Sequence, residues 1–139
     1  MCIDRTEDHM AVGLVGVVIE KRQLRAFSDL AEVNSSTVAI EMSRACDLYI
    51  AKMALNDEIL ARLEISPYAQ SKTAVWLSAA QRSALEQLSE RNGTFVPNEL
   101  RRAFMSYIQT EVYDDIQAFG LRLDRARRLK RKLARQLLA

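Results

Sequence analysis

Apolar and polar residues along the chain follow two different periods, and each change of period marks a predicted element. Residues 14–19 and 72–77 are short runs rich in Val, Ile, Leu and Trp, and the second run alternates between polar and apolar positions, which is typical of a β-strand. From Glu20 and Ser78 onward, apolar residues recur at helical spacing. The pattern therefore predicts a strand followed by a helix at two places in the chain.

Each of these helices is predicted to end near an asparagine and to be followed at once by a second helix. Asn34-Ser35 and Asn92-Gly93 suit the left-handed residue that closes a helix. Ser36-Thr37 and Thr94 are the expected caps of the second helices, and Pro97 is tolerated in a first helical turn. The second helices carry one buried stripe each, formed by Val38, Met42, Ala45 and Tyr49 and by Val96, Leu100, Ala103 and Tyr107.

The two strand-helix-helix units resemble each other in sequence. A shift of 58 positions aligns residues 17–50 with residues 75–108 without a gap, and 12 of the 34 pairs are identical, whereas typical composition would give roughly two. A lone strand needs a partner for its backbone groups, so we expect the two strands to pair as an antiparallel ribbon, with four helices over one face. The expected fold class is mainly α: an internal duplication that forms one pseudo-twofold domain.

The rest of the chain is divided around these units. The pattern from Asn56 to Leu63 predicts a short extra helix, which Ser66-Pro67 ends. After Tyr107 the helical pattern continues through Phe119, and Gly120 is a candidate kink. The expected division is a flexible N-terminal tail (1–13), the first unit (14–53), a helical linker (54–71), the second unit (72–113) and a basic amphipathic C-terminal helix (114–139).

Length and composition indicate one globular domain. The chain has 139 residues, 49% of them hydrophobic and 27% charged, as in ordinary soluble proteins. Its longest apolar stretch, residues 11–19, is far shorter than the roughly 20 residues that span a bilayer, and no export signal precedes it. Cys2 and Cys46 read as separate free thiols, with Cys46 on a core position. A cytoplasmic protein without a membrane span is expected.

Residues that carry catalysis are scarce. The single histidine, His9, falls in the expected tail, so triads and histidine-ligated metals lack their central residue. The cysteines form no Cys-x-x-Cys pair, and the four scattered glycines form no phosphate loop. Asp114 and Asp115 are adjacent on a helix and point to different faces, which favours a solvated role. No enzyme activity, cofactor or metal site is expected.

Charge is distributed unevenly along the chain. Residues 121–139 carry eight Lys or Arg and one Asp, a net charge of +7, while the remaining residues carry −5. Leu123, Ala126, Leu133 and Leu137 share one face of this predicted basic helix. Three interpretations stay open: contact with nucleic-acid phosphates, docking on an acidic membrane surface or partner protein, and simple solvation of the cations while the leucines pack on the body.

A strand, a helix, a turn at Asn-Gly and a second helix opening near Ser or Thr resemble the ribbon-helix-helix superfamily, the DNA binders that include the Arc and MetJ repressors. The resemblance is best over residues 72–108 and covers about half of the chain when both units are counted. Family members are usually homodimers of one unit each, and two units in one chain resemble the TraY-type accessory proteins of conjugative plasmids. The resemblance implies a monomeric pseudo-dimer; further self-association stays open.

In that family the ribbon enters the major groove, where its outward side chains read base edges, while the amides opening the second helix hold phosphates. By position, the resemblance implies an inward set of Val15, Val17, Ile19, Thr73, Val75 and Leu77, and an outward base-reading set of Leu14, Gly16, Val18, Lys72, Ala74 and Trp76. The phosphate-binding positions are Ser36, Thr37, Thr94 and Phe95, together with Arg127, Arg128, Lys130 and Arg131 of the basic helix.

Among the outward residues, only Lys72 is an obvious base reader, because the other five cannot donate a comparable hydrogen bond in the major groove. The resemblance implies a non-enzymatic duplex-DNA binder that acts as a transcriptional repressor or plasmid-transfer accessory factor. Leu14, Val18 and Trp76 would instead form an exposed apolar patch, which favours a protein-interaction module that keeps the fold but has lost base readout. A third interpretation is that the chain's own extensions cover the ribbon.

Overall fold

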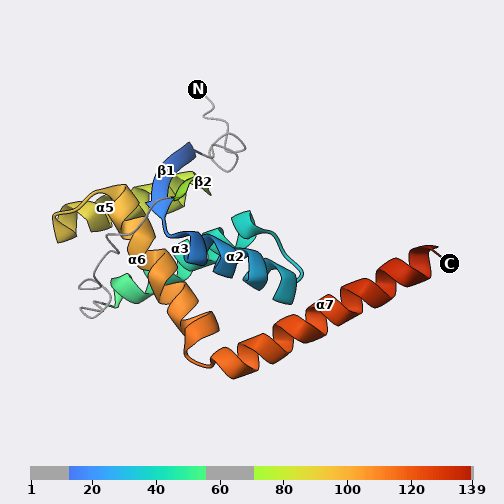
Figure 1. Ribbon diagram of the computed structural model, residues 1–139. Coiled ribbons are helices and arrows are strands. Elements are labelled where there is room, and N and C mark those ends of the chain that lie inside the picture. The colour runs from blue at the N-terminus through green and yellow to red at the C-terminus, as the bar shows by residue number, and fades with distance from the viewer. Residues whose placement is uncertain (1–12, 56–70, 139) are drawn as a thin grey trace.

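The computed structural model describes residues 13–55 and 71–138 and is mainly helical, with one two-stranded antiparallel sheet (Figure 1). The elements are β1 (Gly13–Ile19), α2 (Lys21–Val33), α3 (Val38–Ala54), β2 (Ser71–Leu77), α5 (Ala79–Asn92), α6 (Val96–Ile108), the π-helical turn η1 (Gln109–Tyr113) and α7 (Ile116–Leu138). The mainly α class and both strands are confirmed, each strand beginning one residue earlier than predicted. The tail up to residue 12 and the helix expected at 56–63 lie outside the described residues.

The two strands form a ribbon whose register is centred on Gly16 and Ala74. These residues face each other across the ribbon, and they are also 58 positions apart in the sequence. The same shift of 58 positions turns each pair on one side of this centre into the pair at the same distance on the other side: Leu14 corresponds to Lys72, and Val18 to Trp76. On the outer face the pairs are Leu14 with Trp76, Gly16 with Ala74, and Val18 with Lys72.

The helices that follow the strands begin and end where the sequence pattern predicts. Glu20 and Ser78 are the N-caps of α2 and α5, and each forms a capping box with the glutamine three residues later. The left-handed residues that close these helices are Ser35 (φ 51°) and Gly93 (φ 65°), again 58 positions apart. A glycine adopts this conformation without strain, whereas a serine does so at a cost.

The second helices begin differently from each other. Thr37 caps α3 as predicted, because its hydroxyl accepts a hydrogen bond from a first-turn amide at 3.2 Å. The prediction that Thr94 caps α6 is wrong: the N-cap position is Phe95, and the Thr94 hydroxyl donates to the carboxylate of Glu99 at 2.8 Å. The buried carboxylate of Glu99 is a strong acceptor and therefore takes the Thr94 hydroxyl. The cap position itself falls on Phe95, whose side chain has no acceptor. Pro97 lies in the first turn, as expected.

The core lies between the inner face of the ribbon and helices α2, α3, α5 and α6. At its centre the ring of Phe27 meets Phe104 edge-on with centroids 5.0 Å apart and stacks on Tyr107 at 6.1 Å. Of the predicted inward and stripe residues, those fully buried are Val17, Ile19, Met42, Ala45, Tyr49, Val75, Leu77, Leu100, Ala103 and Tyr107, while Val15, Val38, Thr73 and Val96 are half-buried.

Two glutamates, Glu41 and Glu99, are completely buried, and each is surrounded by hydrogen-bond donors of the same four kinds. Glu41 accepts from Asn34 (3.0 Å), Ser36, Arg44 (2.7 Å) and Tyr107 (2.7 Å). Glu99 accepts from Asn92 (2.7 Å), Thr94 (2.8 Å), Arg102 (2.9 Å) and Tyr49 (3.0 Å). In both cases the tyrosine comes from the other strand-helix-helix unit, so the two units are joined by polar bonds as well as by the apolar core.

This environment shifts the acidity of the groups involved. Burial by itself would raise the pKa of Glu41, but hydrogen bonds from Ser36, Tyr107 and Asn34 and the charge of Arg44 together hold that pKa below its ordinary value. Burial and the neighbouring carboxylates raise the pKa of both tyrosines, so each stays a neutral donor. The folded state therefore favours an ionised Glu41.

The C-terminal helix differs from its prediction in where it begins. The chain turns sharply between η1 and α7 (Figure 1), at Asp114-Asp115, and not at Gly120, which lies inside α7. The Asp115 side chain accepts a hydrogen bond from the amide of Ala118 at 3.0 Å and so caps α7. Asp115 therefore has a structural role, whereas the sequence predicted only a solvated carboxylate. The helix starts at Ile116, two residues later than expected, and its 23 residues span about 35 Å.

Candidate nucleic-acid interface

The outer face of the ribbon is exposed along its length. Five of the six predicted outward residues are exposed and Val18 is half-buried, which places the whole set on one side of β1 and β2. Leu14 and Trp76, which pair across the strands, are 52% and 53% exposed. Among the described residues nothing covers this pair.

The centre of this face is narrow and carries the predicted base reader. Gly16 and Ala74 present almost no side chain, and the Lys72 stem lies across β1, with its Cε 3.8 Å from the place where a Cβ on Gly16 would stand. Small residues permit close approach of another backbone or a nucleic acid. Lys72 therefore extends over the middle of the ribbon, beside the small residues Gly16 and Ala74.

Two arginines that the sequence analysis did not single out stand beside the ribbon. Arg82 of α5 occupies the space above Gly13, where an added Cβ would lie 2.6 Å from its guanidinium. Arg101 of α6 donates from Nε to the carbonyl of Val18 at 2.8 Å and so fixes the far end of β1. No local motif marks these residues, because only the packing of α5 and α6 against the strands brings them there.

The helix starts predicted to hold phosphates are occupied in part by the fold itself. The Ser36 and Thr94 hydroxyls donate to Glu41 and Glu99, and the backbone amides of the same residues donate to the carbonyls of Ala31 (2.9 Å) and Ser89 (2.8 Å). The phosphate-binding role predicted for these two residues therefore conflicts with bonds inside the fold. Phe95 projects from the start of α6 with 76% of its surface exposed. The predicted positions thus lie at two helix N-termini, with their side chains used differently.

The basic helix α7 presents cations in three directions. Arg127 donates to Asp29 (3.1 Å) and Glu32 (3.2 Å) of α2, so its predicted role in holding phosphate conflicts with two ion pairs that anchor α7 to the body. Lys130 faces the corner between α2 and α3. Arg128 and Arg131 lie with Lys132 and Arg135 on the exposed side of the helix.

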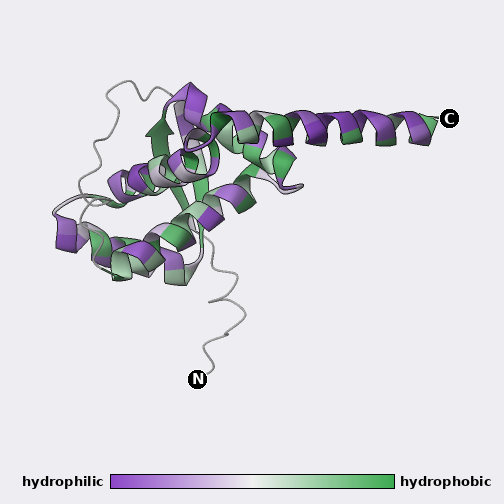
Figure 2. Cartoon of the chain, turned by 90° about the horizontal axis from the view of Figure 1, so that it is seen from below, coloured by the Kyte–Doolittle hydropathy of each residue, from purple (hydrophilic) through white to green (hydrophobic). Residues whose placement is uncertain are grey.

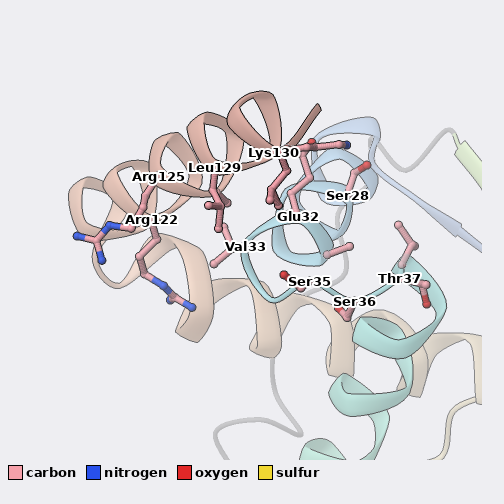
Figure 3. Close-up of a pocket in the computed structure, with 14 residues that line it drawn as sticks. Ser28, Glu32, Val33, Ser35, Ser36, Thr37, Arg122, Arg125, Leu129 and Lys130 are labelled. Carbon is pink, nitrogen blue, oxygen red and sulfur yellow. The ribbon is translucent and has the colours of Figure 1, made fainter. Parts of the chain in front are cut away.

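Cations lead from the ribbon toward α7. A shallow groove of about 450 Å³ is lined by Lys21 and Arg25, at the ribbon end of α2, by Val38 in the first turn of α3, and by Arg127 with its ion-pair partner Asp29. A larger groove on the other side of Ser28 and Val38 is lined by Ser36 and Thr37 and by cations of α7 (Figure 3). The N-terminus of α3, itself weakly positive, therefore lies between two sets of basic side chains.

The buried titratable groups belong to the core. Burial raises the pKa of the Cys46 thiol to about 12, with the charge of Asp47 adding to the effect, which leaves it a weak nucleophile. The cavity beside Tyr49 and Tyr107 measures about 20 Å³, too small for a substrate. Within residues 13–55 and 71–138 no three His, Cys, Asp or Glu side chains are placed to bind a metal ion.

No protein-family model, curated protein or solved structure matches this chain. Over the described ranges, every helix is too short or too polar to cross a membrane.

Proposed function

We propose that this protein is a non-enzymatic duplex-DNA-binding protein of the tandem ribbon-helix-helix type, which acts as a transcriptional repressor or a plasmid-transfer accessory factor. The observation that carries the proposal is the exposed two-stranded antiparallel ribbon, backed by two helix pairs and centred on Gly16 and Ala74. A ribbon of two strands fits the major groove of B-DNA, where its outward side chains meet base edges.

The arrangement of equivalent residues supports a tandem repeat with a pseudo-twofold axis. The 58-residue shift relates the centre of the ribbon, the left-handed residues Ser35 and Gly93, and the donors around the two buried glutamates. Each tyrosine bonds the glutamate of the other unit, as an axis between the units requires. A monomer with this arrangement supplies both DNA-binding units that a homodimer would bring to the two half-sites of its DNA.

Electrostatics support contact with the DNA backbone at helix N-termini and along α7. The amides opening α3 and α6 would hold phosphates next to the ribbon, and the exposed Arg128 and Arg131 would add contacts that do not depend on base sequence. Lys72 is the outward residue best suited to read a base. Only one strand supplies such a reader, so the proposal includes unequal recognition of the two half-sites.

Fluorescence provides the direct test, because Trp76 is the single tryptophan and lies on the proposed reading face. Addition of the protein should raise the fluorescence anisotropy of a labelled DNA duplex at low salt, and the affinity should fall steeply at moderate salt. Trp76 emission should change on the same titration, since the ribbon is dehydrated in the groove. No binding at micromolar protein in low salt would refute the proposal; binding without any change in Trp76 emission would refute the role of the ribbon.

Charge variants separate the contributions. Arg128→Gln with Arg131→Gln should weaken binding and reduce the salt slope by about 2, as expected when two phosphate contacts are lost. Lys72→Gln should reduce discrimination between duplexes of different sequence. Lys52→Gln is the matched control, because Lys52 lies in the last turn of α3, about 20 Å along the helix from the α3 N-terminus, and should change neither quantity.

The second candidate function is a protein-interaction module, and the exposed Leu14–Trp76 pair favours it. Under this alternative the ribbon docks on an apolar surface of another protein. Trp76→Ala and Val18→Lys should then abolish capture of that protein and leave DNA affinity unchanged. A DNA footprint that disappears with Trp76→Ala would argue for the ribbon as a DNA surface.

A further inference from the structure

A groove that is open on one side lies between α7 and the corner where α2 ends and α3 begins. It has a volume of about 840 Å³, which is in the range of sites that enclose a ligand. Figure 3 shows Leu129 of α7 and Val33 of α2 pointing toward each other across it, with Ser35, Ser36 and Thr37 along its lower edge. Two separate parts of the chain thus form its walls.

The floor of the groove is apolar. Val33 and Val38 line it from the body, and Ala126, Leu129 and Leu133 line it from α7. Leu129 and Leu133 lie one helical turn apart on the same side of α7. Their side chains are 56% and 51% exposed. Such an apolar wall has no complement in a phosphate backbone, but it suits the apolar face of a helix.

The apolar stripe of α7 continues past the body. Leu123 packs against the core, Leu129 and Leu133 line the groove, and Leu137 lies one turn further with 87% of its surface exposed. Figure 2 shows hydrophobic and hydrophilic residues alternating along the projecting helix to its end. The same stripe is therefore half-buried in its first part and lacks cover among the described residues in its last.

The charges at the groove select the occupant. Arg122, Arg125 and Lys130 line it, while the one acid that lines it, Glu32, already accepts from Arg127 at 3.2 Å. The weakly positive start of α3 adds to the same potential. An occupant with carboxylates beside an apolar stripe would meet both features.

A second copy of α7 fits this surface poorly. Residues 121–138 carry a net charge of +7, so two such helices side by side would repel each other at every turn. The groove therefore favours an occupant of opposite charge over self-pairing.

We propose that this groove is a docking site for an acidic amphipathic helix of another protein. Its leucine-type residues enter between Leu129, Leu133 and Val33, and its carboxylates meet Arg125 and Lys130. The groove is separate from the ribbon but includes Ser36, Thr37 and Lys130, which are also predicted phosphate-binding positions. Binding of the helix is proposed independently of DNA binding. The groove would give the protein a second binding surface on the C-terminal helix.

The test uses the full chain and a labelled peptide of about 18 residues with leucines at helical spacing (i, i+3, i+4, i+7) and glutamates elsewhere. The peptide should raise anisotropy at micromolar protein. A scrambled peptide of the same composition, which keeps the charge and loses the stripe, should bind at least about tenfold more weakly. Equal binding of the two peptides, or no binding of either, would overturn the proposal.

Variants locate the binding. The double variant Leu129→Ser with Leu133→Ser should lower the affinity for the peptide at least about tenfold, because both side chains are exposed in the free protein and buried in the complex. Leu121→Ser is the matched control on the same helix: it is 61% exposed and lies outside the groove lining, so affinity should stay within about twofold. Circular dichroism checks that both variants keep their helices.

Other occupants give different results. A duplex oligonucleotide that displaces the peptide and itself loses affinity with the Leu129 and Leu133 changes would make the groove a nucleic-acid site. A dimer in sedimentation that dissociates with the same changes would assign it to a second copy. Binding to anionic vesicles that depends on these leucines would assign it to a membrane surface. Each of these outcomes overturns the proposal of a protein helix.

Discussion

The buried tyrosine hydroxyls are expected to contribute measurably to stability, and Tyr49→Phe isolates one of them. The change removes a single oxygen that donates to Glu99 at 3.0 Å from a side chain only 1% exposed, and it leaves the ring in place. Hydrogen bonds to charged groups contribute about 1.5–3 kcal/mol. Because Glu99 keeps three other donors, we expect a loss of about 2 kcal/mol in the free energy of unfolding.

Urea denaturation followed by circular dichroism at pH 7 measures this loss, and thermal unfolding should show a decrease of about 6 °C in Tm. Tyr107→Phe is the equivalent change in the other unit, where the hydroxyl donates to Glu41 at 2.7 Å, and it should cost a similar amount. The double variant should lose about 4 kcal/mol, since the two networks share no hydrogen-bond partner.

Tyr113→Phe serves as the control, because Tyr113 is 36% exposed and lies in η1, outside both networks; it should change stability by less than about 0.5 kcal/mol. If Tyr49→Phe and Tyr107→Phe behaved like this control, the hydroxyls would not be bonded to the glutamates. The two units would then not be joined by these polar bonds.

Three further predictions concern the backbone, a carboxylate and a thiol. Ser35→Gly should stabilise the protein by about 1 kcal/mol and Gly93→Ser should destabilise it similarly in urea melts, because both positions have positive φ. Glu41 stabilises the fold fully above its unfolded pKa of 4.5, and the contribution is lost as pH falls through its lower folded pKa; Glu41→Gln should flatten this dependence. In a Cys2→Ser background, native Cys46 should react with a disulfide reagent at pH 8 far more slowly than in urea, since only ~1 in 10⁴ thiols is ionised.

Local patterns in the sequence predicted the elements, because each depends on neighbouring residues alone. The change from alternation to helical spacing predicted the start of α2 and α5, and the alignment with residues 72–77 supplied the phase of β1, which is apolar at nearly every position. Gly120 was a plausible kink, but a helix interior tolerates one glycine, whereas the Asp115 side chain competes directly for the amides that open α7.

The buried networks were harder to predict, although most of their residues were visible as identities in the 34-residue alignment. Glu41, Arg44 and Asn34 are polar types that usually lie on the surface, so their repetition alone did not indicate burial. The deciding contact is between Tyr107 and Glu41, 66 positions apart, and only the packing of α3 against α6 brings them together. The proximity of Arg82 and Arg101 to the ribbon depends on tertiary packing in the same way.

The pairing of β1 with β2 also has a consequence for folding during synthesis. β1 leaves the ribosome about 58 residues before its partner strand, and the tyrosine that bonds Glu41 follows later still. Until then, the first unit has an unpaired strand edge and a carboxylate without its cross-unit donor, so it has little stability of its own. We therefore expect folding to be concerted and late, with both units reaching the native state together once α6 has been made.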